Sequence, residues 1–220
     1  MVRIVKDPEQ RRLEIIETAC EVFLQKGYES TTMSDVMRLL DIAKGTIYHY
    51  FRSKEELLDA VLLYITDGEQ RRIQQVFDTL QGNALERLQA LIFSISHENH
   101  DTELLENLHK PANAGMHIRL HARTLLMLTP FFAELFEKGR QEGVFHLDDP
   151  LACAEFIFAA TTFLTDMGFY PWTPDQLERR IKAMPNLIER QLGAAPGSFD
   201  FLRANLQEGL QPGQDTKDSQ

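Results

Sequence analysis

TTMSDVMRLLDIAKGTIYHYFRSKEE, residues 31–56, is the stretch that decides the fold. Its apolar positions predict two short helices joined by a tight turn, followed by the start of a third helix. In the second short helix, Ile47 and Phe51 lie one turn apart and are expected to face the core. The other side chains of this helix are then expected to face solvent. They include Lys44, Thr46, Tyr48, His49 and Tyr50.

Signals for helix starts flank the two short helices. Thr32 is followed three residues later by Asp35, the spacing of a capping box. Ser53-Lys54-Glu55-Glu56 repeats this signal and begins a long helix that is expected to run to about Leu80. Between the short helices, Asp41-Ile42-Ala43 is the predicted turn.

The rest of the chain is helical by its pattern, with apolar residues recurring at helical spacing. The predicted segments are 8–26, 54–80, 85–95, 101–109, 115–141, 151–169 and 174–192. Pro130 is expected to kink or restart one of them. The segment 151–169 is apolar on nearly every face, which is typical of a helix buried between layers. We find no strand pattern and predict an all-α fold.

Composition and charge narrow the class of protein. Cys20 and Cys153 lie in apolar helical patterns, which favours reduced core residues in an intracellular, cytoplasmic protein. No apolar run reaches the ~20 residues of a membrane helix, so we expect no membrane partner. The formal net charge is −10, but from Arg38 to Lys54 four basic side chains stand against one acid. An acidic body with one basic face repels phosphate everywhere except at that face.

The sequence bears on three classes of function. An enzyme is disfavoured, because the sequence has no HExxH, no nucleophile elbow and no Gly-rich phosphate loop; no cofactor is expected. A metal-dependent hydrolase would have to use the histidines alone. A helical adaptor that binds protein is disfavoured by the basic, tyrosine-rich stretch 44–54.

A DNA-binding helix-turn-helix accounts best for residues 31–54. Such a motif inserts the N-terminal half of its second helix into the major groove while the first helix braces it. Lysines, threonines and tyrosines hold phosphates, and exposed side chains of the inserted helix reach base edges. The stretch supplies residues for each of these roles.

The run TTMSDVMRLLDIAKGTIYHYFRSKEELL, after a helix that ends in FLQKGYEST, closely resembles the DNA-binding domain of TetR-family transcriptional regulators. The resemblance covers about residues 9–60. It implies an all-helical homodimer that represses a palindromic double-stranded DNA operator and is released when a small-molecule effector binds its C-terminal domain. The DNA contacts implied by position are Thr32, Lys44, Gly45, Thr46, Tyr48, His49, Tyr50 and Lys54, and Thr31 stands at the same helix start.

Two residues depart from the family pattern in the turn. Asp41 stands where glycine is usual, and Ala43 stands where serine or threonine is usual. Aspartate tolerates the left-handed conformation better than most residues, so we expect the turn to be kept. Alanine cannot cap the next helix, which costs about 1 kcal/mol of local stability. A slightly loose recognition helix that orders on DNA is the resulting prediction.

Beyond residue 60 the sequence has no sharp motif, and an effector site must be argued from side chains. The tentative lining is Phe93, His97, Met116, His117, His121, Met127, Phe131, Phe163 and Met167. Five of the seven histidines fall between 97 and 121. They could be ordinary surface or core residues, polar groups of an organic-ligand pocket, or ligands of a metal-responsive repressor through His97, His100, His117 and His121.

These interpretations define a domain plan. Residues 8–53 form a three-helix DNA-binding domain, residues 54–208 a larger helical effector-binding and dimerisation domain, and residues 209–220 a disordered tail. Residues 151–192 are the predicted dimer interface, where two helices from each protomer would form a four-helix bundle.

Overall fold

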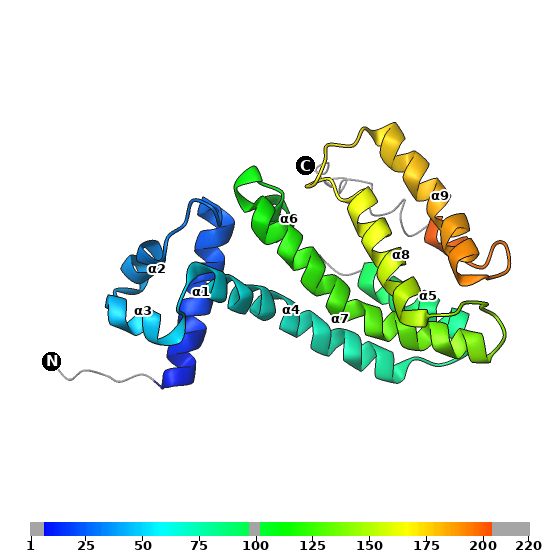
Figure 1. Cartoon of the computed structure of the whole chain (residues 1–220), viewed down its shortest axis with the longest axis horizontal. Helices are drawn as coiled ribbons and strands as arrows, with labels where there is room; N and C mark the ends of the chain where they lie inside the picture. Colours follow the sequence, from blue (N-terminus) through cyan, green and yellow to red (C-terminus); the bar gives the residue numbers. More distant parts are fainter. Residues whose placement is uncertain (1–6, 97–101, 204–220) are drawn as a thin grey trace, which may run out of the picture. The chain divides into compact units, whose positions relative to one another are not determined.

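The computed structural model describes residues 7–96 and 102–203, and over these residues it is helical without strands. The helices of the N-terminal half are α1 (Pro8–Lys26), α2 (Met33–Leu40), α3 (Lys44–Tyr50), α4 (Lys54–Thr79) and α5 (Ala84–Ser96). They are followed by α6 (Thr102–Leu108), the 3₁₀ turn η1 (Pro111–Asn113), α7 (Ala114–Gln141), α8 (Pro150–Thr165) and α9 (Pro174–Leu192). Figure 1 shows their course, and the predicted all-α class is confirmed.

The helix ends follow the chemistry of their capping residues. The Thr32 hydroxyl oxygen accepts from the Asp35 N–H at 3.3 Å, and the Asp35 carboxylate accepts from the Thr32 N–H at 2.9 Å. Together they form the predicted capping box. Thr173 and Gln176 form a second capping box at the start of α9. Gly27 ends α1 with a φ of 94°, a left-handed value that glycine tolerates.

The chain divides into two compact units. The first unit comprises residues 1–71 with 99–124, and the second comprises residues 72–98 with 125–220. The division falls inside α4 and inside α7, so it follows packing and not the ends of helices. The functional boundary that we predicted at residues 53 and 54 stays a prediction, and the tail 209–220 lies outside the described residues.

The first unit has a core of its own beneath the two short helices. Ile15, Ala19 and Phe23 of α1 are fully buried, and Ile47 and Phe51 complete this layer. Leu57, Leu58 and Val61 extend it along α4. Burial of each such side chain stabilises the fold by about 1.5–3 kcal/mol. This apolar core therefore fixes how α3 lies on α1 and α4.

The second unit is built around α5, the later part of α7, α8 and α9. Its core contains Leu88, Leu91, Phe132, Phe136 and Ile188. Helices α8 and α9 pack against each other, as Figure 1 shows. Helix α7 passes through Pro130 as one helix, so the predicted restart does not occur.

Helix α8 differs from the sequence prediction of a helix buried on every side. Phe156 is 62% exposed and Phe163 is 54% exposed in the single chain. Within one protomer, only one side of α8 faces the core. An apolar face is left for another molecule to cover.

The two cysteines are free thiols, as predicted. Burial and the nearby Glu21 carboxylate raise the pKa of the Cys20 thiol to about 11, which keeps it protonated and unreactive. Of the helices in residues 7–96 and 102–203, none combines the length and apolarity that a bilayer crossing requires.

Candidate DNA interface and effector cavity

The turn between α2 and α3 depends on Asp41. Among the described non-glycine residues, Asp41 alone has a positive φ, with φ 49° and ψ 48°. The N–H of Ile42 donates to the Met37 carbonyl at 3.1 Å and closes the end of α2. The prediction that aspartate would keep this left-handed turn is confirmed.

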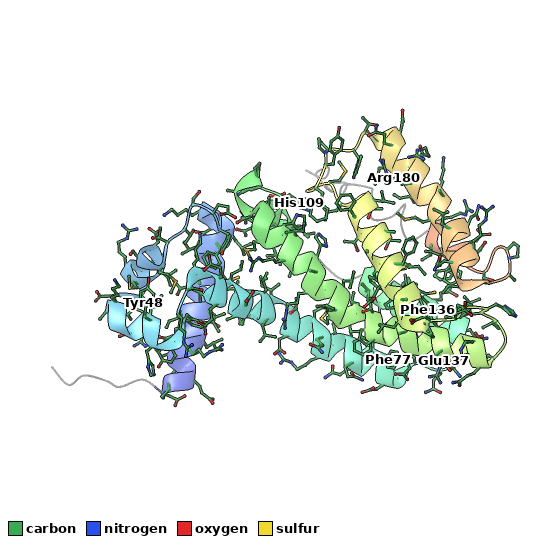
Figure 2. All side chains as sticks on the ribbon, viewed as in Figure 1. Tyr48, Phe77, His109, Phe136, Glu137 and Arg180 are labelled. Atoms are coloured by element: carbon green, nitrogen blue, oxygen red, sulfur yellow. The ribbon has the colours of Figure 1, made fainter. Side chains whose placement is uncertain are left out.

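Helix α3 packs through one side only. Ile47 is fully buried, and Phe51, which ends the helix, is buried beside it. Tyr48, labelled on α3 in Figure 2, is 41% exposed. The other exposed residues of this helix are Lys44, Gly45 and His49, whereas Thr46 and Tyr50 are half-buried. The surface of α3 therefore carries most of the side chains that were predicted to meet DNA.

The start of α3 has no side-chain cap. Ala43 occupies the N-cap position, and its carbonyl accepts from the Thr46 N–H at 2.9 Å. The backbone N–H groups at this end are thus available to an external acceptor, and a phosphate oxygen is a suitable one. The predicted looseness of α3 stays a prediction.

Asp35 organises the start of α2. Its carboxylate accepts from the Lys26 ammonium at 2.7 Å, from the Arg38 guanidinium at 2.5 Å, and from Thr32. The hydrogen bond from Lys26, followed by those from Thr32, holds the pKa of Asp35 well below its usual range. Neither Lys26 nor Arg38 was among the predicted site residues, yet this network places both cations beside Thr32.

Two side chains that were predicted to contact DNA, those of Thr31 and Lys54, form hydrogen bonds with backbone carbonyls of the protein itself. Thr31 is 1% exposed, and its hydroxyl donates to the Gly27 carbonyl at 2.8 Å. The structure therefore does not support Thr31 as a side-chain contact to DNA. The Lys54 ammonium donates to the Tyr28 carbonyl at 2.9 Å and lies 4.3 Å from the centre of the Tyr28 ring. It would have to share its hydrogen bonds with a phosphate.

Gly45 is not required by the packing of the protein. A Cβ atom added at this position would meet nothing within 4 Å, and its backbone is not in the left-handed region. Glycine inside a helix costs about 1 kcal/mol relative to alanine. The absence of a side chain at an exposed helix start is consistent with close approach of a DNA backbone.

A cavity of about 190 Å³ lies within the second unit. Its walls come from α5, α7, α8 and α9, and Phe136 of α7 is labelled in Figure 2. Leu88, Ile92, Phe132 and Phe158 are among the apolar side chains that line it. In the described part of the chain, no charged side chain contributes to this lining.

The predicted effector residues lie elsewhere. Among those that the structure describes, none lines this cavity. Phe93, Phe163 and Met167 have exposed side chains, and Met116 is fully buried in the core of the first unit. Met127 and Phe131 pack against the core of the second unit. Ligand contact by this set stays a prediction without support from the cavity.

The histidines form a local cluster in the first unit. The Nε2 atoms of His117 and His121 are 2.8 Å apart, and the rings of His109 and His117 are 5.1 Å apart. Two nitrogens that bind one tetrahedral zinc at 2.0–2.1 Å stand about 3.3 Å apart. The pair thus has the spacing of a hydrogen bond, in which one ring donates and the other accepts. His97 and His100 lie outside the described residues.

Sequence reasoning missed most residues of the cavity and a buried polar residue, Asn113. The cavity side chains are aliphatic and aromatic residues at ordinary core spacing, so nothing in the pattern distinguishes a wall from a filled core. Asn113 lies between Pro111 and Gly115 in a stretch without periodicity. No signal in a single sequence identifies it.

Comparison with known proteins agrees with this geometry. Residues 15–61 match the family described as "Bacterial regulatory proteins, tetR family", and residues 95–187 match "Tetracyclin repressor-like, C-terminal domain". The chain belongs to the TetR family. The first of the two TetR matches covers α2, the turn and α3, so it includes the whole helix-turn-helix.

Two TetR-family relatives illustrate how far the likeness extends. The HTH-type transcriptional repressor KstR2 of Mycobacterium tuberculosis is 35% identical over 94 residues, which are 43% of this chain and 46% of KstR2. The HTH-type transcriptional regulator UidR of Escherichia coli is 27% identical over 139 residues, 60% of this chain and 67% of UidR. The match to KstR2 thus spans just under half of that protein.

A solved TetR-family structure shares the fold. The transcriptional regulator of this family from Pectobacterium atrosepticum aligns with a TM-score of 0.59 at 21% identity. The alignment covers 85% of this chain and 98% of that one. The TetR fold therefore extends through both compact units.

Proposed function

We propose that this protein is a transcriptional repressor that binds a palindromic DNA operator as a homodimer and leaves it when a small molecule binds the C-terminal part. One observation carries the DNA-binding role. Helix α3 is held by Ile47 and Phe51, while Lys44, Tyr48 and His49 face solvent. A helix held on one side and polar on the other is what insertion into the major groove requires.

The basic side chains of the same region support this role. Arg38, Lys44 and Arg52 are exposed around the helix-turn-helix of a chain whose formal net charge is −10. Phosphate attraction is then confined to one surface, which orients the protein on a duplex. In this proposal Tyr48 and His49 lie nearest the bases, and Thr32, Tyr50 and Lys54 hold phosphates.

The apolar face of α8 supports the homodimer. Leu151, Phe156 and Phe163 are exposed large apolar residues on this helix. A second copy would cover them by placing its own α8 and α9 against residues 151–192, which gives a four-helix bundle. Such a dimer sets the distance between two copies of α3, and with it the spacing of the operator half-sites.

Repression and effector release are the finer parts of the proposal. KstR2 is named as a repressor, which favours repression over activation here. The apolar cavity of the second unit gives a small molecule a place to bind. The alternative of a metal-responsive repressor has less support, because His117 and His121 are at hydrogen-bond distance from each other.

A gel-shift titration tests the proposal. The probe is the DNA upstream of the protein's own gene, and the control is a duplex of the same composition in scrambled order. We expect retention of the upstream probe by two protomers, weakened steeply as salt rises, because phosphate contacts release counterions. Equal affinity for both duplexes would contradict the proposal, and so would binding by a single protomer.

A further inference from the structure

The chemistry of the cavity in the second unit limits the molecules that it accepts. Its walls are aliphatic and aromatic, and the polar residues in its lining are Ser96, Thr161 and Thr165. All three carry hydroxyl groups, and none carries a charge. Among the described residues, the lining therefore offers no charge to pair with an anion or a cation.

The hydroxyl groups of the two threonines on α8 already donate hydrogen bonds to backbone carbonyls of the same helix. The Thr161 hydroxyl donates to the Ile157 carbonyl at 2.7 Å, and the Thr165 hydroxyl donates to the Thr161 carbonyl at 2.8 Å. A hydroxyl oxygen that donates in this way still has lone pairs to accept a hydrogen bond. At these two positions the cavity thus offers acceptors to a ligand.

The buried carboxylate of Glu189, beside the cavity, already accepts a hydrogen bond from the protein backbone. Glu189 of α9 is buried, and its carboxylate accepts from the Phe199 N–H at 3.1 Å. Phe199 lines the cavity, but Glu189 does not. Moving a charged ligand into such a site without a partner costs several kcal/mol, and none of the described lining residues supplies that partner.

The volume sets the size of the ligand. A dry apolar cavity of about 150 Å³ holds benzene. At about 190 Å³ this cavity has room for one ring with a short substituent.

We infer that the effector is an uncharged, mainly apolar molecule of about one ring, with a hydrogen-bond donor directed at Thr161 or Thr165. This inference rests on the proposed function, because it assigns the effector class to the regulator's C-terminal part. It also places recognition in α5, α7, α8 and α9 of the second unit. The effector is then selected by its neutrality and size.

Calorimetric titration of the full chain with three matched probes tests the inference. 4-Ethylphenol is neutral and donates a hydrogen bond, ethylbenzene is neutral without a donor, and 4-ethylbenzoate is an anion near neutral pH. We expect 4-ethylphenol to bind more tightly than ethylbenzene by about three- to tenfold, the worth of one neutral hydrogen bond. 4-Ethylbenzoate should not bind. Binding of the benzoate as tight as that of the phenol, or no binding of any probe, would overturn the inference.

A pair of variants locates the binding site. Thr161→Val keeps the shape of the side chain but removes the acceptor, so the preference for 4-ethylphenol over ethylbenzene should disappear. Thr162→Val is the control, because Thr162 is the next residue of α8 and does not line the cavity. An unchanged preference in Thr161→Val, with Thr165→Val also unchanged, would place the phenol elsewhere.

Operator binding without any probe separates this inference from the proposed function. If the chain binds 4-ethylphenol as expected but retains no upstream DNA, the proposed function fails and the cavity chemistry stands. If the chain binds the DNA but none of the three probes, the proposed function stands and the effector class is wrong.

Discussion

The backbone N–H of Tyr28 donates a hydrogen bond of 2.7 Å to Oδ1 of Asn113, a fully buried residue 85 positions further along the chain. The Asn113 amide nitrogen donates in turn to the carbonyls of Leu24 at 3.2 Å and Asn107 at 2.9 Å. These carbonyls lie in the last turns of α1 and α6, where carbonyl groups have no N–H donor within their own helix. One side chain thus joins the helix that supports the DNA-binding motif to the segment before α7.

Replacing Asn113 should destabilise the protein. In Asn113→Ala, the Tyr28 N–H and the carbonyls of Leu24 and Asn107 each lose a hydrogen bond, and we expect the free energy of unfolding to fall by about 1–3 kcal/mol. Urea unfolding followed by circular dichroism measures this change. Asn186→Ala is the control, because Asn186 is exposed on α9 and should change stability by less than about 0.5 kcal/mol. Equal effects of the two changes would contradict the role of Asn113.

Two exposed helical glycines separate DNA contact from helix stability. Gly45 in α3 and Gly68 in α4 both have open space where a Cβ would stand. Alanine at either position should raise the stability of the folded chain by up to about 1 kcal/mol. Only Gly45→Ala should weaken operator binding, because its methyl group would meet the DNA backbone. If both variants keep full affinity in fluorescence anisotropy, Gly45 does not approach DNA.

The Asp35 network predicts a pH dependence. The folded-state pKa of Asp35 is lowered mainly by its hydrogen bond from Lys26. Its stabilising contribution is therefore complete above the unfolded pKa of about 3.9 and is lost as pH falls below that value. The melting temperature of Asp35→Asn should lie below that of the wild type at pH 7. This gap should narrow below about pH 4, and a gap that widens there would contradict the account.

Charge on the α8 face should break the dimer. Phe156→Glu places a carboxylate where the second copy is proposed to pack, and a buried unpaired charge costs several kcal/mol. Sedimentation analysis should then show a monomer with unchanged helix content. Leu39→Glu is the matched control, because Leu39 is 63% exposed, close to the 62% of Phe156, but lies on α2. Dimers in both variants would move the interface away from α8.

The sequence predicted the DNA-binding part in detail because its signals are local. Capping at Thr32, the left-handed turn at Asp41 and the i, i+4 pair Ile47 and Phe51 are each set by residues within a few positions. Burial of the Thr31 hydroxyl was not predicted, because it depends on how α1 ends. This contact could not be derived from residue type.

The effector region was predicted poorly because its geometry is non-local. The cavity walls are core-type residues from separate helices, such as Ile92 and Phe158, and whether they leave a space depends on how those helices pack. Phe163 was assigned to the pocket for its chemistry, yet it faces away from the protomer's core. The histidines drew attention by their number, whereas the cavity residues that the structure describes carry no charge.

The central claim is that α3 contacts operator DNA, and two matched tyrosines test it most directly. Tyr48 on α3 and Tyr64 on α4 are 41% and 44% exposed. Fluorescence anisotropy with the DNA upstream of the gene should show that Tyr48→Ala weakens binding by about tenfold, equal to about 1.4 kcal/mol. Tyr64→Ala should bind as the wild type does. Unchanged affinity in Tyr48→Ala, or an equal loss in both variants, would contradict the assignment of α3 as the helix that contacts operator DNA.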